Sequence, residues 1–223
     1  MKSREVYKRY LLKINKNDTN EGINILPSLF VLMFNSEAQR WLGQKLTDDG
    51  DNIKLDHLDT LLETDVELSE IKAGIGWKEY QLPKDFYRHS SSYAIASKGN
   101  CTGVTVYYFE KKALGLSAIL ADDFNKAHFD YEEGPMIITQ NRIKAYTGDF
   151  EIEKFLASYY RVPVAIDIAG YKHIDGTPST DVDCELDDHS VDEVLNRLTL
   201  EIVREYENSE AFQYAKERIA TEP

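Results

Sequence analysis

The sequence predicts an α+β fold in which N- and C-terminal helices form a helical bundle around a strand-rich middle containing an antiparallel meander. Apolar residues recur at helical spacing in residues 1–72 and again in 181–223, whereas 73–180 is rich in glycine, aromatic and β-branched residues. With 223 residues, 42% of them hydrophobic, the chain can bury a sizeable core. This length fits one domain with an elaboration or two small lobes, and we expect residues 1–223 to form a single domain.

The first third of the chain predicts helices. Ser3 is a suitable N-cap for the first helix, because its hydroxyl can accept a hydrogen bond from a free amide of the first turn. Apolar residues then recur at helical spacing up to Ile14, which predicts an amphipathic helix of about three to four turns. Residues 15–22 are rich in Asn, Asp, Thr and Gly and indicate a polar linker.

Pro27 can occupy the first position of a second helix that runs to about Leu46. Its apolar stripe is so wide that the helix must be buried on more than one side or present half of its surface to another subunit. The stripe consists of Leu29, Phe30, Val31, Leu32, Met33, Phe34, Ala38, Trp41 and Leu42. A polar break at 47–51 precedes a third predicted helix over residues 53–62.

From Gly74 onward, glycine and proline separate short aromatic and β-branched runs, a composition typical of strands and loops. Trp77–Leu82 is a predicted strand. Val104–Phe109 is the clearest strand by residue type, because valines, threonine and aromatic residues alternate along it. Residues 121–133 fit either a short helix or a loop.

The meander is predicted between residues 136 and 162. Three strand patterns cover Met136–Thr139, Arg142–Thr147 and Phe150–Val162. Gln140-Asn141 and Gly148-Asp149 separate them, and Asn and Gly both accept the positive φ angle that tight hairpin turns require. The three strands are therefore expected to pair in chain order.

The best-specified helix is predicted from Ser190 to Asn208. Ser190 and Glu193 have the spacing of a capping box, in which the hydroxyl serves the N3 amide and the carboxylate reaches back to the N-cap amide. An apolar stripe then faces the core: Val191, Val194, Leu195, Leu198, Ile202 and Val203. A final helix from Ser209 carries Phe212, Ala215 and Ile219 at helical spacing. We expect the long helix to pack on the N-terminal bundle.

The charge balance is strongly acidic, with 26 Lys and Arg against 39 Asp and Glu and a net charge of −13. We therefore expect no attraction of the whole surface to nucleic acid or anionic lipid, and we expect any contact with DNA to be repulsive or local. The two cysteines, Cys101 and Cys184, lack metal-type spacing and predict free thiols, with a single chance disulfide left open. The N-terminus has no apolar leader pattern, and the longest apolar run, 29–34, is too short to span a bilayer, so a soluble, non-secreted protein is expected.

The richest cluster of charged side chains is the stretch Asp181–His189, with His173 and Asp175 nearby in sequence. A calcium-binding EF-hand loop needs Gly at its sixth position and Glu at its twelfth, where this chain has Leu186 and Asp192. A solvated acidic loop leading into a helix N-terminus accounts for the same residues without a ligand. We therefore predict no metal and no cofactor, and that Asp183 and Glu185 bind no metal with functional consequence.

The sequence contains no GxSxG elbow, HExxH pair, GxGxxG loop or P-loop, so no catalytic residues are predicted. Ser90-Ser91-Ser92 follow His89, but adjacent residues rarely face one another, and the segment is interpreted as a turn. Tyr159-Tyr160-Arg161 could stack on bases, although aromatic residues at a strand end more often serve a core or a subunit contact.

Several of these segments, taken in order and spacing, have a counterpart in a known family. They are Phe34-Asn35-Ser36-Glu37-Ala38-Gln39 with Trp41, Leu82-Pro83-Lys84-Asp85-Phe86, Asn141-Arg142-Ile143-Lys144, Tyr159-Tyr160-Arg161 with Pro163, and Asp183-Cys184-Glu185-Leu186 with His189 before a long helix. This pattern resembles the head-to-tail adaptor, or ring, proteins of tailed bacteriophages, and it looks closest to those of crAss-like phages. The resemblance spans most of the chain.

The resemblance implies a structural virion protein without enzyme activity. In that family a dodecameric ring lies beneath the portal at the head–tail interface, joins the head to the tail and lets the genome pass through its lumen. The implied partners are other copies of the chain, the portal protein, other tail ring proteins and the passing DNA, which is not bound by sequence. A strongly acidic chain suits a channel wall because it repels DNA, and polar strand tips such as Thr139–Arg142 suit docking onto neighbouring rings.

Two functions from other classes stay open: a small metal-dependent hydrolase built on Asp181–His189, and a monomeric binding module. Within the ring hypothesis we expect the ring that adjoins the portal, because the chain is short and has no appended domain for fibres or cargo. Deleting the chain from Ser209 onward is predicted to leave the fold intact and to abolish portal binding.

Overall fold

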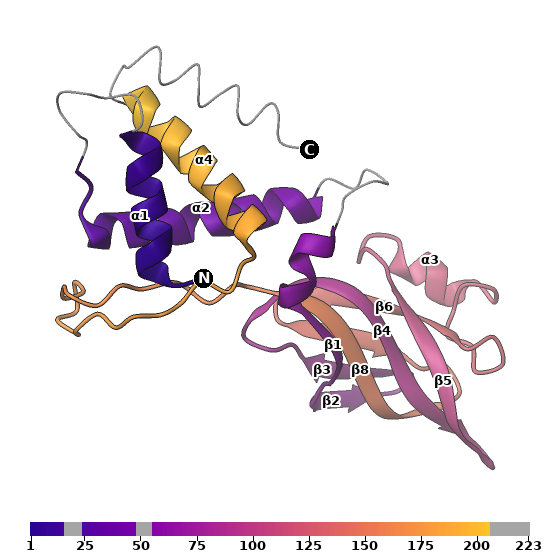
Figure 1. Cartoon of the computed structure of the whole chain (residues 1–223). Helices are drawn as coiled ribbons and strands as arrows, with labels where there is room; N and C mark the ends of the chain where they lie inside the picture. Colours follow the sequence, from indigo (N-terminus) through magenta and orange to yellow (C-terminus); the bar gives the residue numbers. More distant parts are fainter. Residues whose placement is uncertain (16–23, 48–54, 206–223) are drawn as a thin grey trace. The chain divides into compact units, whose positions relative to one another are not determined.

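The computed structural model describes residues 1–15, 24–47 and 55–205 (Figure 1). The chain forms two compact units. Met1–Thr60 together with Pro163–Pro223 form the first, which we call the helical unit, and Leu61–Val162 form the second, which we call the sheet unit. The sheet unit is thus inserted in the chain between the two segments that form the helical unit.

Three helices build the described part of the helical unit: α1 (Ser3–Ile14), α2 (Pro27–Thr47) and α4 (Asp188–Glu205). Phe30 of α2 joins α1 to α2, because its ring centroid lies 5.2 Å from that of Tyr7 and 5.1 Å from that of Tyr10. The buried side chains of α4 follow the predicted stripe and are Val191, Val194, Leu195, Leu198 and Ile202. Helical periodicity therefore predicts the buried faces of α1 and α4, whereas Leu29 and Leu32 of the predicted α2 stripe are exposed.

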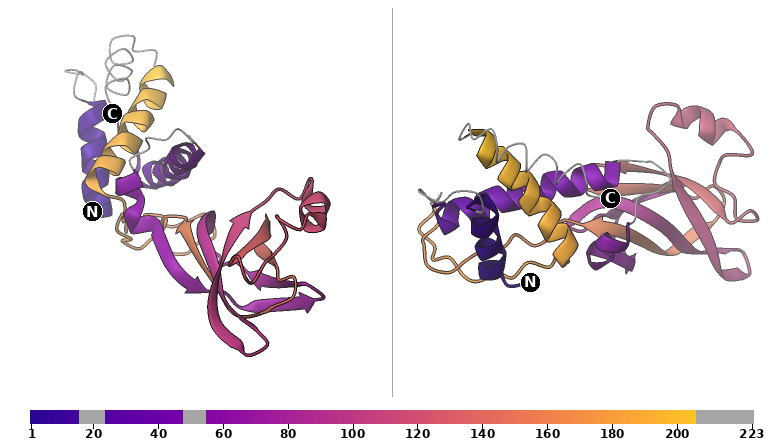
Figure 2. Two further views of the ribbon diagram at one scale, coloured as in Figure 1. Left: turned by 90° about the vertical axis from the view of Figure 1, so that its right-hand side faces the viewer. Right: turned by 45° about the horizontal axis from the view of Figure 1, so that its top comes forward.

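The predicted helical bundle is wrong. Figures 1 and 2 show α2 crossing α1 and α4 instead of running alongside them. Crossed helices touch over a short length, and the aromatic contacts of α1 on α2 accordingly concentrate at Phe30. The third predicted helix is a single seven-residue 3-10 segment, η1 (Leu55–Leu61), and the final helix predicted from Ser209 lies outside the described residues.

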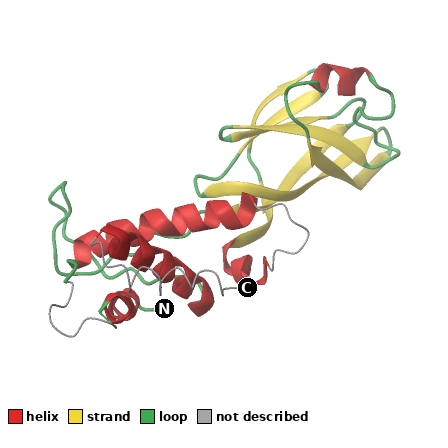
Figure 3. Cartoon of the chain, turned by 90° about the horizontal axis from the view of Figure 1, so that it is seen from above, coloured by secondary structure: helices red, strands yellow, loops and turns green. Residues whose placement is uncertain are grey.

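The sheet unit is an eight-stranded mixed sheet that curls on itself, and it makes the fold richer in strand than the sequence predicts (Figure 3). The strand order is β1-β8-β4-β5-β6-β7-β3-β2, in which only β5 and β6 pair in parallel. The strands are β1 (Leu62–Glu67), β2 (Glu70–Gly74), β3 (Trp77–Gln81), β4 (Phe86–Lys98), β5 (Cys101–Glu110), β6 (Glu133–Thr139), β7 (Arg142–Tyr146) and β8 (Glu151–Arg161). A short helix, α3 (Leu116–Ala121), lies in the connection between the parallel strands.

One bent stretch of chain supplies both edges of the sheet. β1 pairs with β8, β2 pairs with β3, and only Leu68 and Ser69 separate these two edge strands. The bend is held by backbone hydrogen bonds on both sides, from Leu68 N to Phe155 O and from Gln81 N to Ser69 O, each 2.9 Å. Because consecutive residues belong to opposite edges, the sheet must curl.

Stacked aromatic rings fill the inside of the curl. The ring of Phe155 stacks on Tyr80 at 4.6 Å and meets the edge of Tyr108 at 5.2 Å. Burial raises the pKa of the Tyr108 phenol, and its hydroxyl donates a hydrogen bond to Tyr146 O at 3.1 Å. Gly134 passes so close that a Cβ atom there would lie 2.8 Å from the Tyr108 ring. The Tyr108 ring therefore fits in this core only because Gly134, which faces it, has no side chain.

The predicted three-strand meander is also wrong. β6 and β7 do form a hairpin, in which Thr139 pairs with Arg142, although Gln140 and not Asn141 takes the positive φ angle, 49°. Gly148 has the expected positive φ of 57°, but β8 then leaves β7 and inserts between β1 and β4. β8 is buried on both faces over residues 157–160, and it has a hydrogen-bonded neighbour on each edge, β1 on one side and β4 on the other.

The strands predicted at 77–82 and 104–109 are confirmed as β3 and β5. Three others were not predicted. β1 and β2 lie in a region assigned to helix, and β4 runs through the serines interpreted as a turn. β4 tolerates those serines because its pairing with β8 shifts register between His89 and Ser91, an irregularity that residue type alone does not reveal.

Candidate functional site

The stretch between β8 and α4, residues 163–187, holds most of the predicted candidate residues, and we call it the acidic loop. It belongs to the helical unit and doubles back on itself. Two isolated antiparallel bridges, between Asp167 and Val182 and between Lys172 and Pro178, tie its outgoing and returning arms. The loop is therefore a long irregular hairpin and not a random connection.

The carboxylates of the loop serve as hydrogen-bond acceptors for separate parts of the backbone. Asp181 Oδ1 accepts bonds from Ala169 N at 2.9 Å and from Arg4 Nε at 3.1 Å. Glu185 Oε1 accepts one from Val164 N at 2.6 Å. Because these side chains point to different amides they do not converge, and the described residues contain no group of three or more His, Cys, Asp or Glu able to hold a metal ion.

Two aspartates of the same stretch cap helices. Asp183 Oδ1 accepts the amide of Ser3 in the first turn of α1 at 3.3 Å, and Asp187 Oδ1 accepts the amide of Ser190 in the first turn of α4 at 2.7 Å. A carboxylate at a helix N-terminus satisfies a free amide and opposes the positive end of the helix dipole. Much of the acidity of this stretch is thus explained by local structure.

Both serine caps predicted from sequence are wrong. The hydroxyls of Ser3 and Ser190 are buried, and neither has a hydrogen-bond partner among the described residues. α4 begins at Asp188, so its N-cap is Asp187, three residues before the predicted one. Aspartate and serine are both good N-caps, so residue type could not decide between two candidates in one short stretch.

Glu193, the other half of the predicted capping box, joins α4 to α2. Its carboxylate is 3% exposed and accepts hydrogen bonds from Trp41 Nε1 at 2.5 Å and from Lys45 Nζ at 3.0 Å. His189 Nε2 lies 3.1 Å from the same carboxylate. A buried carboxylate needs such partners to offset its lost hydration, which makes Glu193 a fixed contact between the two helices.

The centre of the acidic loop is Asp167, which the sequence did not single out. Its carboxylate accepts hydrogen bonds from Tyr171 Oη at 2.6 Å, Ile168 N at 2.8 Å and Thr180 N at 3.0 Å, and His173 Nε2 lies 3.1 Å away. Burial raises the pKa of Asp167, but these hydrogen bonds outweigh it and hold the pKa below its usual range. Asp167 therefore organises the loop as a charged acceptor.

Of the two residues predicted to lie near the acidic stretch, His173 joins this cluster and Asp175 does not. Asp175 instead accepts the amide and hydroxyl of Thr177 at the tip of the loop. Burial and the hydrogen bond to Asp167 raise the pKa of Tyr171 to about 12. In the sequence this cluster is visible only as Asp167 followed by Tyr171 and His173. Such a spacing is too common to be recognised as a cluster without the fold.

An arrangement of serine, histidine and glutamate forms in β4 and β5, where the sequence predicted a turn. His89 Nε2 lies 2.9 Å from Ser92 Oγ, and His89 Nδ1 lies 4.0 Å from Glu110 Oε2. Ser92 is only 4% exposed, and its hydroxyl donates to Met136 Sδ at 3.2 Å. Burial also lowers the pKa of His89. A nucleophile must reach a substrate, so this buried contact is part of the sheet core and not a catalytic triad.

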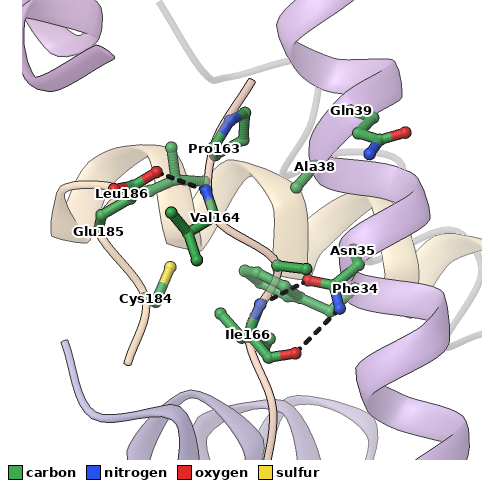
Figure 4. A pocket seen from close by; sticks show the side chains of 11 residues that line it. Phe34, Asn35, Ala38, Gln39, Pro163, Val164, Ile166, Cys184, Glu185 and Leu186 are labelled. Carbon is green, nitrogen blue, oxygen red and sulfur yellow. Dashed lines mark hydrogen bonds between the residues drawn. The ribbon is translucent and has the colours of Figure 1, made fainter. Parts of the chain in front are cut away.

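The segments that carried the family resemblance meet in pairs within each unit. In the helical unit, Phe34, Asn35, Ala38 and Gln39 of α2, the stretch from Pro163 to Ile166, and Cys184, Glu185 and Leu186 line one small cavity of about 20 Å³ (Figure 4). Asn35 holds the backbone of Ile166 at both ends, accepting from its amide at 2.9 Å and donating to its carbonyl at 3.0 Å. The cavity has room for about one water molecule.

In the sheet unit the same holds for the other segments. Leu82 N donates to Asn141 O at 2.9 Å, and Tyr159 Oη donates to Asp85 Oδ1 at 3.1 Å. Val162 N donates to Asp85 O at 2.7 Å, which fastens the end of β8. All these motif residues therefore act in the first place as contacts that hold each unit together.

A groove of about 800 Å³ lies between α2 and α4, both in the helical unit, and we call it the leucine groove. Its apolar lining includes Leu26, Leu29 and Leu32, which are 66%, 48% and 69% exposed. Glu37 and Arg40 line it as well and form an ion pair at 2.8 Å, and burial raises the pKa of Glu37. The wide stripe of α2 is thus buried on one side and open on the other.

These features define a two-unit α+β protein with an apolar groove in its helical unit. No protein-family model matches the chain, and a search of curated proteins finds no significant match. Within the described ranges, no helix is long and apolar enough to cross a membrane.

Proposed function

We propose that this protein is a structural component of the head-to-tail connector of a tailed bacteriophage, forming a ring beneath the portal. The observation that carries the proposal is the leucine groove. Leu26, which directly precedes α2, and Leu29 and Leu32 of α2 are 66%, 48% and 69% exposed to water, an arrangement that is unfavourable unless another surface covers it. In a ring, that surface belongs to the neighbouring copy.

A closed ring requires a heterologous contact, in which one patch of each subunit meets a different patch of the next. The leucine groove is asymmetric, since α2 and α4 form its walls and are unrelated in sequence. It therefore suits a head-to-tail contact better than a two-fold one. The ring hypothesis assigns the remaining partners: the portal protein on one side, other tail rings on the other, and the genome in the lumen, all at the head–tail interface of the virion.

The charge distribution supports a position beside DNA. Residues 163–223 contain 15 Asp and Glu against five Lys and Arg, whereas residues 1–60 contain nine of each. A wall with this excess repels the phosphate backbone and lets DNA slide without sticking. The hydrolase alternative gains no such support, because the described carboxylates of Asp181–His189 bind amides and basic side chains of the protein itself.

The test is assembly with the portal protein of the phage that encodes the chain. Wild-type protein is expected to form rings on the portal, visible by negative-stain microscopy and as a mass increase in light scattering. Leu29→Asp together with Leu32→Asp is expected to reduce ring formation at least tenfold, because two charges would enter the subunit contact. Leu12→Asp is the matched control, since Leu12 is 72% exposed on α1 and does not line the groove.

If the Leu29→Asp/Leu32→Asp variant still forms normal rings, α2 does not form the subunit contact. A wild-type protein that stays monomeric, never binds a portal and hydrolyses phosphoesters with a divalent metal would overturn the ring proposal as a whole.

A further inference from the structure

The leucine groove needs an apolar occupant, and in a ring of identical subunits that occupant comes from the same sequence. The connection between β5 and β6, residues 111–132, contains three large hydrophobic side chains that face water, Leu114, Phe124 and Tyr131, which are 94%, 85% and 66% exposed. Among the described residues outside the groove, no other connection between neighbouring elements exposes three such side chains. This connection therefore carries apolar surface of the kind that the groove lacks.

Contacts within the connection hold Phe124 and Tyr131 on one hydrogen-bonded turn, and we call these two residues the aromatic tip. Asp122 Oδ1 accepts a hydrogen bond from Phe124 N at 2.9 Å. The ring centroid of Tyr131 lies 5.0 Å from that of His128, and His128 Nε2 donates a hydrogen bond to the carbonyl oxygen of Asp123, the residue before Phe124. The two side chains are therefore held by the same local structure.

The residues between the two aromatic side chains are fastened to the core of the sheet unit. Ala127 and Phe129 are 4% and 8% exposed, and the ring centroid of Phe129 lies 5.9 Å from that of Phe150. His128 and Glu133 also exchange two backbone hydrogen bonds. Figures 1 and 2 show α3 and its flanking loops projecting from the sheet. The aromatic tip is thus fixed in advance, and such an anchor loses little conformational entropy on binding.

We propose that the aromatic tip of one subunit binds in the leucine groove of the next subunit around the ring. The inference rests on the proposed function and names the two patches of its heterologous contact. Aromatic side chains bury about 150–250 Å² each and are enriched at the centre of interfaces. Two of them cover the exposed surface of Leu26, Leu29 and Leu32, and the groove, at about 800 Å³, is as large as pockets that enclose a whole small ligand.

The other fully exposed hydrophobic turns fit the groove less well. Ile75 at the β2–β3 turn is 102% exposed, and Ile174 in the acidic loop is 110% exposed. Each offers a single large apolar side chain, because Ile75 stands between Gly74 and Gly76 and Ile174 is followed by Asp175. A groove with three exposed leucines requires more apolar surface than one isoleucine provides.

Charge gives the bound tip a direction. Arg40 lines the groove with its side chain 57% exposed, and Glu201 lines the groove as well. On the tip, the side chain of Asp123 is 83% exposed beside Phe124. Docking that turns Asp123 toward Arg40 brings opposite charges together, whereas the reverse orientation turns Asp123 toward Glu201. The groove therefore favours one orientation of the tip.

The test is cross-linking of rings assembled on the portal protein. All chains carry Cys101→Ser, which removes the exposed native thiol and leaves only the buried Cys184. Ser36 lines the groove and Asn125 follows Phe124, so Ser36→Cys/Asn125→Cys places one thiol on each patch and keeps the leucines and the aromatic tip. A short bismaleimide is expected to join neighbouring subunits into a ladder of oligomers on a denaturing gel.

Control variants show what the ladder reports. Leu12 is 72% exposed and does not line the groove, so Leu12→Cys/Asn125→Cys is the matched control and is expected to give at least about tenfold less ladder. Adding Phe124→Asp and Tyr131→Asp to Ser36→Cys/Asn125→Cys is expected to reduce the ladder by at least about tenfold, because two charges enter an apolar contact. Chains with only one of the two cysteines stop at a dimer, since each thiol is linked once. Circular dichroism checks that every variant is folded.

Each other result overturns the inference. Cross-links of Ser36→Cys/Asn125→Cys that leave the chain at monomer mass would place the tip in the groove of its own chain. A ladder from Ser36→Cys/Ile75→Cys in its place would identify the β2–β3 turn as the occupant. Normal rings without a ladder, or a ladder that the charged tip leaves unchanged, would show that the tip does not fill the groove while the proposed function holds. The absence of rings on the portal would contradict the inference and the proposed function together.

Discussion

The two units of this protein are stabilised in different ways. The sheet unit is held by stacked aromatic rings around Phe155, and its charges nearly balance, with 12 basic and 15 acidic residues. The helical unit has 14 basic and 24 acidic residues, and buried or half-buried carboxylates such as Asp167 and Glu193 link its parts. It also contains the leucine groove. The comparison teaches that the sheet unit contains the buried aromatic core, whereas the excess of negative charge and the exposed leucines of the groove lie in the helical unit.

The largest expected effect lies in the sheet core. Phe155→Ala removes a fully buried ring that contacts both Tyr80 and Tyr108, and we expect a loss of about 3–5 kcal/mol in the free energy of unfolding. Urea denaturation followed by tyrosine fluorescence measures it. Tyr107→Ala, at a site 60% exposed, is the control and should cost at most about 0.5 kcal/mol. Similar losses for both variants would show that the aromatic core does not dominate the stability of this unit.

The second effect tests the carboxylate at the centre of the acidic loop. Asp167→Asn keeps the shape but removes the charged acceptor of hydrogen bonds from Tyr171 and two backbone amides, and a loss of about 1.5–3 kcal/mol is expected. Asp175→Asn at the exposed tip serves as the control. Thermal melts compare the two variants. Equal melting temperatures for Asp167→Asn and Asp175→Asn would show that Asp167 does not organise the loop.

The same residue predicts a pH dependence. Because the pKa of Asp167 in the folded protein is held below its usual range, its contribution is fully present above about pH 4 and is lost as the pH falls through the folded pKa. Wild-type protein should therefore lose stability on acidification more steeply than Asp167→Asn. The measurement is the free energy of unfolding of both proteins from pH 6 to pH 2.5, and an equal pH dependence in the two would contradict this prediction.

The smallest effect separates the predicted and observed caps of α4. Asp187→Ala should cost about 1 kcal/mol, because it removes the acceptor for Ser190 N. Ser190→Ala should be close to neutral or slightly stabilising, because the buried hydroxyl that it removes has no hydrogen-bond partner among the described residues. A larger cost at Ser190 than at Asp187 in chemical denaturation would restore the capping box predicted from the sequence.

The sequence by itself determined the features that depend on neighbours along the chain. The spacing of Val6, Tyr10 and Ile14 predicts the buried face of α1, and the alternation in Val104–Phe109 predicts β5. The positive φ at Gly148 was predicted for the same reason, because only the local backbone decides it. The wide apolar stripe of α2 likewise predicts a helix with more apolar surface than one neighbouring element can cover.

Only the tertiary structure decided which of these pieces meet. β8 pairs with β1 and β4 and not with its predicted neighbour β7, because hydrogen bonding between strands depends on which edges the fold brings together and not on order in the chain. Asp187 caps α4 in place of Ser190, and Asp183 caps α1 from 180 residues away. Asp167 gathers its donors only once the acidic loop has folded back. Local pattern determines whether a residue can pair, but the energy of pairing depends on burial and distance, which exist only after the chain has folded.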